Sequence, residues 1–149
     1  MVMVIMSEYI GVIYPIPKQF INRFFLDKKN VFVKFLSHES TKLKVKQKII
    51  FYESHGSKKL IGEGRIEKIE FLTPVEIYKK YSNDLFLDEK ELYKYVGDRK
   101  LKKTLTIKLD NLNKYDEPVL FPKPITLAGL YINEKQYRNT IVNTRVKSK

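Results

Sequence analysis

Basic side chains alternate along one short segment of the sequence, at Lys44, Lys46 and Lys48, and Tyr52 follows on the same parity. On an extended strand, alternate side chains project from one face about 6.6 Å apart, which is comparable with the phosphate spacing of a single-stranded nucleic acid. The tyrosine could stack on a base. The pattern predicts a nucleic-acid-binding stripe. The alternative is a solvated face whose charges discourage pairing with another strand edge.

A second pair of candidates, Glu63 and Arg65, lies beside the glycines Gly62 and Gly64. Glycine in a strand lets a ligand or another backbone come close. Arg65 could then stack on a base while the Glu63 carboxylate accepts a hydrogen bond from an exocyclic N–H. The alternative interpretation is a structural ion pair between the two residues that closes a barrel.

Metal and nucleophile chemistry have little support in the sequence. The chain contains no cysteine, and its two histidines, His38 and His55, have no metal-ligand spacing. Ser57 lies near His55 in an expected turn, but a catalytic serine also needs a histidine oriented by a third group. We therefore expect no metal, cofactor or disulfide, and the absence of cysteine fits an intracellular protein.

The overall charge points to a polyanionic partner. The chain has 149 residues, with 29 basic and 17 acidic side chains, a formal net charge of +12. Basic proteins attract nucleic acid because phosphate binding releases condensed counterions. The alternative explanation is a lysine-rich composition of genomic origin. Length and composition predict one domain over residues 1–142, followed by a basic polar tail over 143–149. No segment is long enough to span a bilayer, so we expect a cytoplasmic protein.

These residues need a scaffold of alternating strands and short helices. The pattern predicts a bulge between Ile66 and Ile69, where the apolar positions change parity, and a helix that begins at a Thr73–Glu76 capping box with Pro74 at its first position. The expected strands are 9–14, 31–36, 45–53, 60–72, 101–109, 119–121 and 127–132, and the expected helices are 17–27, 73–81, one from 88 and one from 133.

Three segments carry a family resemblance: Ile49–Glu53, Leu60–Ile66 and Phe71–Tyr78. A strand pair followed by a Thr-Pro-led helix resembles the PUA-like superfamily, which includes the ASCH and EVE branches. More narrowly, the chain resembles an archaeal family of PUA-like proteins with no assigned function. The resemblance implies an α+β fold, with a mixed or antiparallel β-barrel and short peripheral helices.

The resemblance further implies that RNA or a modified nucleotide binds beside the first helix. The basic residues there are Lys18, Arg23, Lys28, Lys29 and Lys34. ASCH amidohydrolases carry a lysine and a threonine just after this helix. Lys28 and Lys29 occupy that place, but no threonine follows in residues 30–33, and the chain has no tryptophan for an EVE-type aromatic pocket.

The resulting hypothesis is a non-catalytic RNA-binding domain. Two alternatives stay open: a hydrolase or reader that acts on a modified nucleoside, and an interaction module of a ribonucleoprotein assembly. A pocket lined by Lys28, Lys34 and Arg65 would favour RNA binding or the modified-nucleoside function, and a closed interior would favour the interaction module.

Overall fold

The structure is a computed structural model that describes residues 9–36, 41–99 and 101–142. Its strands are β1 (Tyr9–Ile16), β2 (Val31–Lys34), β3 (Lys48–Glu53), β4 (Leu60–Leu72), β5 (Thr104–Val119) and β6 (Leu130–Asn133). Its helices are α1 (Lys18–Phe25), α2 (Pro74–Tyr81), α3 (Glu89–Val96) and α4 (Glu134–Tyr137), with a 3₁₀ turn η1 (Gly97–Arg99) and a π-helical turn η2 (Arg138–Val142).

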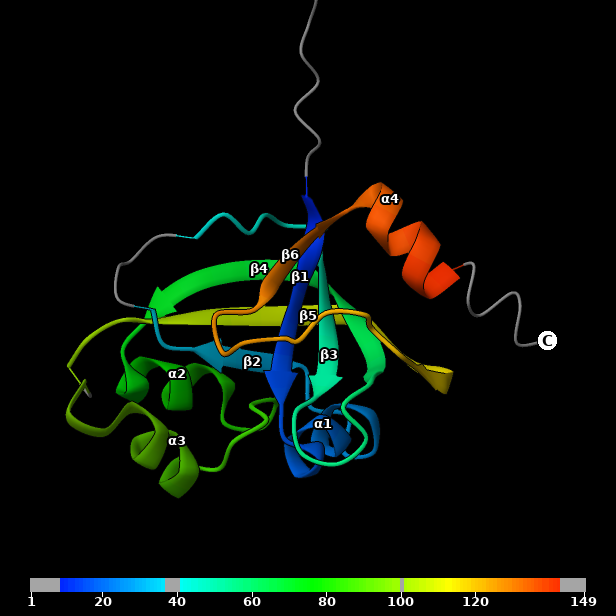
Figure 1. Ribbon diagram of the computed structural model, residues 1–149. Coiled ribbons are helices and arrows are strands. Elements are labelled where there is room, and N and C mark those ends of the chain that lie inside the picture. The colour runs from blue at the N-terminus through cyan, green and yellow to red at the C-terminus, as the bar shows by residue number, and fades with distance from the viewer. Residues whose placement is uncertain (1–8, 37–40, 100, 143–149) are drawn as a thin grey trace, which may run out of the picture.

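The described strands form one mixed sheet in the order β2-β5-β4-β3-β1-β6. Strands β1 and β3 pair in parallel, and the other neighbours pair antiparallel. The long strands β4 and β5 cross the middle of the molecule, with α1, α2 and α3 on one side and α4 on the other (Figure 1).

Alternating side chains build a core on each face of the sheet. Val12 and Ile49 belong to the larger core, which also takes Phe24 of α1 and Leu92 of α3. The next residues along the same strands, including Ile13 and Ile50, belong to a smaller core with Ile132 and Ile141. Because successive residues of a strand point to opposite faces, two apolar residues in a row place one side chain in each core.

Local signals in the sequence predicted several elements correctly. The Thr73–Glu76 capping box is present, as is a second one between Asp88 and Glu91. Strand β4 has the predicted bounds, and its register with β5 shifts between Ile66 and Lys68, which confirms the predicted bulge.

The predicted α+β fold with a mixed sheet is confirmed, but the strands of the described part of the chain do not close into the predicted barrel. The end strands β2 and β6 do not pair with each other, so the sheet is α+β and mixed but open. The predicted strand 101–109 begins only at Thr104 and continues to Val119 as one long strand, β5, so of the predicted strand 119–121 only Val119 is in a strand. The predicted strand 45–53 begins only at Lys48. No helix in the described ranges is long and apolar enough to cross a membrane. His38 and the predicted tail 143–149 lie outside the described residues.

Candidate nucleic-acid interface

The open side of the sheet contains a hollow of about 680 Å³, which we call the β1–β2 cleft. It lies between the end of β1 and strand β2, which are not neighbours in the sheet, and α1 and α3 complete its walls. Its volume falls in the usual range for ligand sites. Apolar side chains dominate its lining: Tyr14, Pro15, Ile16, Pro17, Phe20, Phe32, Val33, Phe86, Leu87, Tyr95 and Leu127. Its polar lining residues are Gln19, Lys34, Glu91 and Lys94.

Aromatic rings give the cleft a rigid lining. The rings of Tyr14 and Phe32 stack across the gap between β1 and β2 with centroids 5.7 Å apart. Phe20 meets Phe86 edge-on at 5.9 Å. Tyr95 is 40% exposed at the cleft, and its hydroxyl accepts a hydrogen bond from the Phe35 backbone N–H at 2.8 Å. Tyr14, Phe32 and Phe86 are buried, so the rings that a flat ligand can reach are those of Phe20 and Tyr95, which are partly exposed and need no new side-chain ordering to stack.

Lys34 provides the partly buried cation of the cleft. Its Nζ donates to the Leu127 carbonyl at 2.7 Å and lies 4.8 Å from the Tyr14 ring centroid. This hydrogen bond connects the end of β2 to the segment before β6. Burial lowers the pKa of the Lys34 ammonium below its ordinary value, because the charged form loses hydration. The same burial raises the pKa of the Tyr14 hydroxyl.

Arg23 holds the helical wall of the cleft in place. Its guanidinium donates to both carboxylate oxygens of Glu91, at 2.5 and 2.9 Å, and to the Phe86 carbonyl at 2.9 Å. This bidentate pair joins α1 to α3. The hydrogen bonds from Arg23 also hold the pKa of the Glu91 carboxyl below its ordinary value. Arg23 thus positions the wall of the cleft. Its predicted binding of nucleic acid stays a prediction.

Comparisons with known proteins agree with this architecture. Residues 9–134 match a family described as "Domain of unknown function (DUF365)". The chain belongs to this family. An uncharacterized protein of Methanocaldococcus jannaschii, MJECS03, is 36% identical over 104 residues, which cover 63% of this chain and 96% of that protein. The predicted membership of an uncharacterised family with an archaeal relative is confirmed.

Solved ASCH structures resemble the DUF365 chain in fold. The S128A mutant of ASCH from Zymomonas mobilis superimposes with a TM-score of 0.71 at 15% identity, over 93% of this chain and 99% of that one. Another structure of ASCH from the same organism gives 0.59 at 18% identity, over 89% of this chain and 80% of that one. At these identities the likeness shows the fold alone, and that fold is similar to ASCH, as expected.

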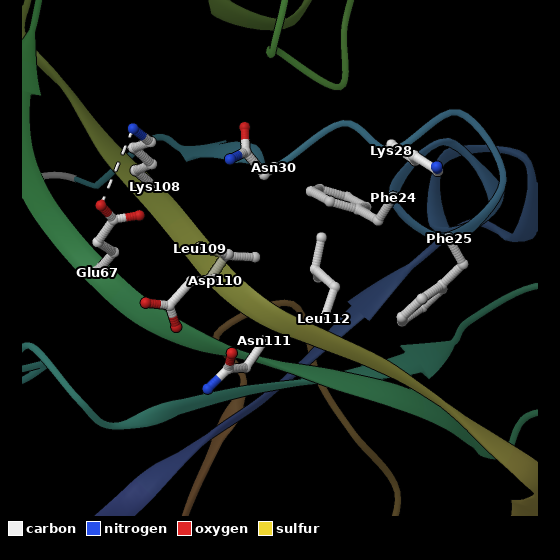
Figure 2. A pocket seen from close by; sticks show the side chains of 10 residues that line it. All are labelled: Phe24, Phe25, Lys28, Asn30, Glu67, Lys108, Leu109, Asp110, Asn111 and Leu112. Carbon is white, nitrogen blue, oxygen red and sulfur yellow. Dashed lines mark ion pairs between the residues drawn. The ribbon is translucent and has the colours of Figure 1, made fainter.

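The basic residues predicted beside the first helix of this DUF365 chain separate into different places. Lys34 lies in the β1–β2 cleft, whereas Lys28 lines another pocket between α1 and β5, which we call the α1–β5 pocket (Figure 2). Lys29 donates to the Asn83 carbonyl at 2.7 Å. Lys18 is exposed at the start of α1. No described pocket is shared by Lys28, Lys34 and Arg65.

The predicted stripe over Lys44, Lys46, Lys48 and Tyr52 does not exist as one strand face. Lys44 and Lys46 precede β3, in a turn where Lys46 has φ +80°. Tyr52 is half-buried against the smaller core. Lys48 donates to Glu63 at 2.6 Å. The predicted strand face is wrong because β3 begins only at Lys48, and the smaller core packs on this face of β3 at Ile50 and Tyr52. Binding of nucleic acid by these residues stays a prediction.

Glu63 and Arg65 do not pair with each other, because each has other partners in the structure. The buried Glu63 carboxylate accepts hydrogen bonds from Lys48 and from the hydroxyls of Tyr115 and Tyr137, both at 2.7 Å. Arg65 is exposed and forms a bidentate pair with Asp110 at 2.8 and 3.0 Å. The expected Glu63–Arg65 pair is therefore wrong, and neither residue lines the cleft.

The aromatic residues that line the cleft were missed as functional candidates. The helical spacing of Phe20 and Tyr95 predicts packing against a core, and spacing alone cannot distinguish a residue in a filled interior from one that lines an opening. The two prolines of the cleft, Pro15 and Pro17, were a usable signal, since they mark where the chain turns from β1 into α1.

Proposed function

We propose that the protein is a nucleic-acid-binding domain that holds single-stranded RNA in the β1–β2 cleft. The observation that carries the proposal is Lys34, a half-buried cation set among aromatic rings in a cleft of about 680 Å³. The ASCH-like fold of the family supports a role of this class. The net charge of +12 would draw a polyanion to the surface around the cleft.

The chemistry of the cleft suits a nucleotide in two ways. An ammonium group has three N–H donors, and the Leu127 carbonyl occupies one donor of Lys34, so others can reach a phosphate or a base carbonyl. The exposed Lys94 gives a second cation at the same cleft. The ring of Tyr95 offers a stacking surface, and stacking accepts any base because every base has a flat π-face.

A charge-matched pair of variants tests the proposal. Lys34→Met removes the cleft cation, and Lys79→Met removes one exposed lysine from α2. Anisotropy of a labelled single-stranded RNA should show about tenfold weaker binding for Lys34→Met and less than about twofold for Lys79→Met, since a charge-assisted contact is worth about 1.4 kcal/mol or more. Equal losses in the two variants would refute the cleft as the site.

A hydrolase is the second candidate, and the lowered pKa of Lys34 favours it. A buried lysine of lowered pKa is a better amine nucleophile. The carboxylate of the cleft, Glu91, is bound to Arg23 and is poorly placed to accept a proton. We therefore prefer binding without turnover. Mass spectrometry of modified nucleosides incubated with the wild type and with Lys34→Met would detect hydrolysis that depends on this amine.

A further inference from the structure

Two tyrosines lie close together at the end of β1 that is far from the first helix. Tyr9 begins β1 and Tyr131 belongs to β6, and their ring centroids are 5.2 Å apart. Tyr9 is 45% exposed, and Tyr131 is half-buried. The Nζ of the exposed Lys42 lies 6.0 Å from the centroid of the Tyr131 ring. We call these three residues the Tyr9–Tyr131 platform, and none of the three lines the β1–β2 cleft.

The platform is continuous with the cleft through Tyr14. Val12 pairs with Tyr131 across the β1–β6 ladder, so Tyr131 and Tyr14 project from the same face of the sheet. The hydroxyl of Tyr131 interacts with that of Tyr14 and, after burial, is the next cause of the raised pKa of Tyr14. The ring of Tyr14 in turn lies 4.8 Å from Nζ of Lys34. A row of tyrosines therefore connects the cation of the cleft to the surface at Tyr9.

A rigid basic turn lies beside the platform, where the segment 41–47 reaches the start of β1 (Figure 1). The Lys44 N–H donates to Oε1 of Gln47, and Nε2 of Gln47 donates to the Tyr9 carbonyl, both at 2.8 Å. The Lys46 N–H donates to the Ile66 carbonyl at 2.8 Å, and Lys46 has φ +80°, where glycine is favoured. These contacts fix the backbone of the turn against β1 and β4.

Packing alone does not account for this arrangement. Tyr131 packs against the larger core, but Tyr9 belongs to neither core. The side chains of Lys42, Lys44 and Lys46 are exposed and form no ion pair within the described ranges. An exposed ring beside free cations suits a single-stranded nucleic acid, because a base can stack on the ring while the ammonium groups bind phosphates.

We propose that a single RNA strand bound in the β1–β2 cleft continues over the Tyr9–Tyr131 platform, where a base stacks on Tyr9 and Lys42 binds the adjoining phosphate. Five residues of β1 separate Tyr9 from Tyr14, a distance of about 16 Å, or roughly two to three nucleotide steps of an extended strand. The inference rests on the proposed function and deepens it, because it gives the bound RNA a direction across the protein and a length of about four nucleotides.

Nuclear magnetic resonance titration with oligoadenylates of two and four nucleotides tests the path. The backbone amide of Val33 reports on the cleft, and that of Tyr131 reports on the platform. The dinucleotide is too short to span both places, so it should shift Val33 alone. The tetranucleotide should shift both amides and bind about tenfold more tightly than the dinucleotide, as expected for one added base stack.

Variants identify the groups responsible. Tyr9→Ala should abolish most of the tenfold gain of the tetranucleotide and leave the dinucleotide unaffected, whereas Tyr9→Phe, which keeps the ring, should retain the gain. Lys42→Met should also weaken the tetranucleotide alone. Lys34→Met should weaken both lengths by the same factor, because both occupy the cleft. The matched control is Tyr93→Ala, which removes a half-buried ring of α3 outside the cleft and the platform and should preserve the gain.

The outcomes distinguish this inference from the proposed function. Equal binding of the two lengths, or a full gain that survives in folded Tyr9→Ala protein, overturns the path over the platform and leaves the cleft standing. A tetranucleotide that shifts Val33 without shifting Tyr131 has the same consequence. If Lys34→Met weakens neither length while Tyr9→Ala weakens both, the cleft is refuted and the continuous path falls with it, because the RNA then binds at the platform alone.

Discussion

Three lysines that look equivalent in the sequence have different roles in the structure. Lys48 is tied to the buried Glu63, Lys34 is half-buried in the β1–β2 cleft, and Lys28 is exposed at the α1–β5 pocket. The sequence identified Lys28 and Lys34 as binding candidates, but it could not separate their sites. What separates them is the neighbouring strand or helix, and that neighbour is distant along the chain.

The lowered pKa of Lys34 predicts an alkaline loss of affinity. Burial makes this ammonium lose its proton at a lower pH than a solvated lysine, so RNA binding should weaken as the pH rises toward the ordinary lysine pKa, before a solvated lysine would lose its charge. Arginine stays charged throughout this range. Anisotropy titrations of Lys34→Arg should therefore show a flatter pH profile than those of the wild type.

Unfolding cannot explain that loss, because the linkage has the opposite sign. A lysine whose pKa is lower in the folded state binds fewer protons there, so its contribution to stability rises with pH between its folded and unfolded pKa values. The raised pKa of Tyr14 costs stability only above the ordinary tyrosine pKa, beyond the range tested. If wild type and Lys34→Arg lose affinity in parallel, Lys34 is not the titrating contact.

For the secondary-structure elements, the sequence predicted the helix starts correctly, but it did not predict the pairing between strands that are distant along the chain. The helix starts at Thr73 and Asp88 could be predicted because a capping box is complete within four residues. The extent of β5 could not, because its far half pairs with β4 across a turn and two helices, as in Leu60 with Val119. The face of β3 that carries Lys48 was misread for the same reason, since α4 covers it from the far end of the chain.

Glu63 is the point where three of these distant elements meet. Its carboxylate receives Lys48 from β3, Tyr115 from β5 and Tyr137 from α4, and its side chain is 8% exposed. Glu63→Leu would leave a cation and two hydroxyls without their acceptor, so we expect a loss of about 2–4 kcal/mol in the free energy of unfolding. Urea denaturation measures this value.

Asp110→Asn is the matched control for Glu63→Leu. It weakens the ion pair with Arg65, whose side chain is 47% exposed, and should change stability little. RNA affinity should be unchanged in folded Glu63→Leu protein, because Glu63 does not line the cleft. A Glu63→Leu protein as stable as the wild type would show that solvent, and not the carboxylate, satisfies the lysine and tyrosines.

For the whole molecule, the open sheet and the net charge act together. Strands β2 and β6 stay apart, and the gap between β1 and β2 is what leaves room for the cleft. A closed barrel would have filled this space with strand pairing. The α+β class could be predicted from the order of the elements. The opening of the sheet could not, because no local pattern in the sequence shows that the end strands β2 and β6 fail to pair.

The net charge of +12 predicts that RNA binding depends strongly on salt. Each phosphate contact releases counterions, and for a single strand the slope of log affinity against log salt is about −0.7 per contact. If roughly four to six phosphates are bound, the slope should lie between about −3 and −4. Titrations of a labelled single-stranded RNA at a series of salt concentrations measure it.

The salt dependence of two variants then shows which group of the RNA Lys34 contacts. If Lys34 touches a phosphate, Lys34→Met should lower the magnitude of the slope by about 0.7, whereas Lys79→Met should leave it unchanged. If Lys34 instead meets a base carbonyl, affinity falls with the slope intact, because no counterion is released at that contact. A wild-type slope near zero would contradict phosphate binding altogether, since a surface of this charge cannot hold a nucleic acid backbone without displacing ions.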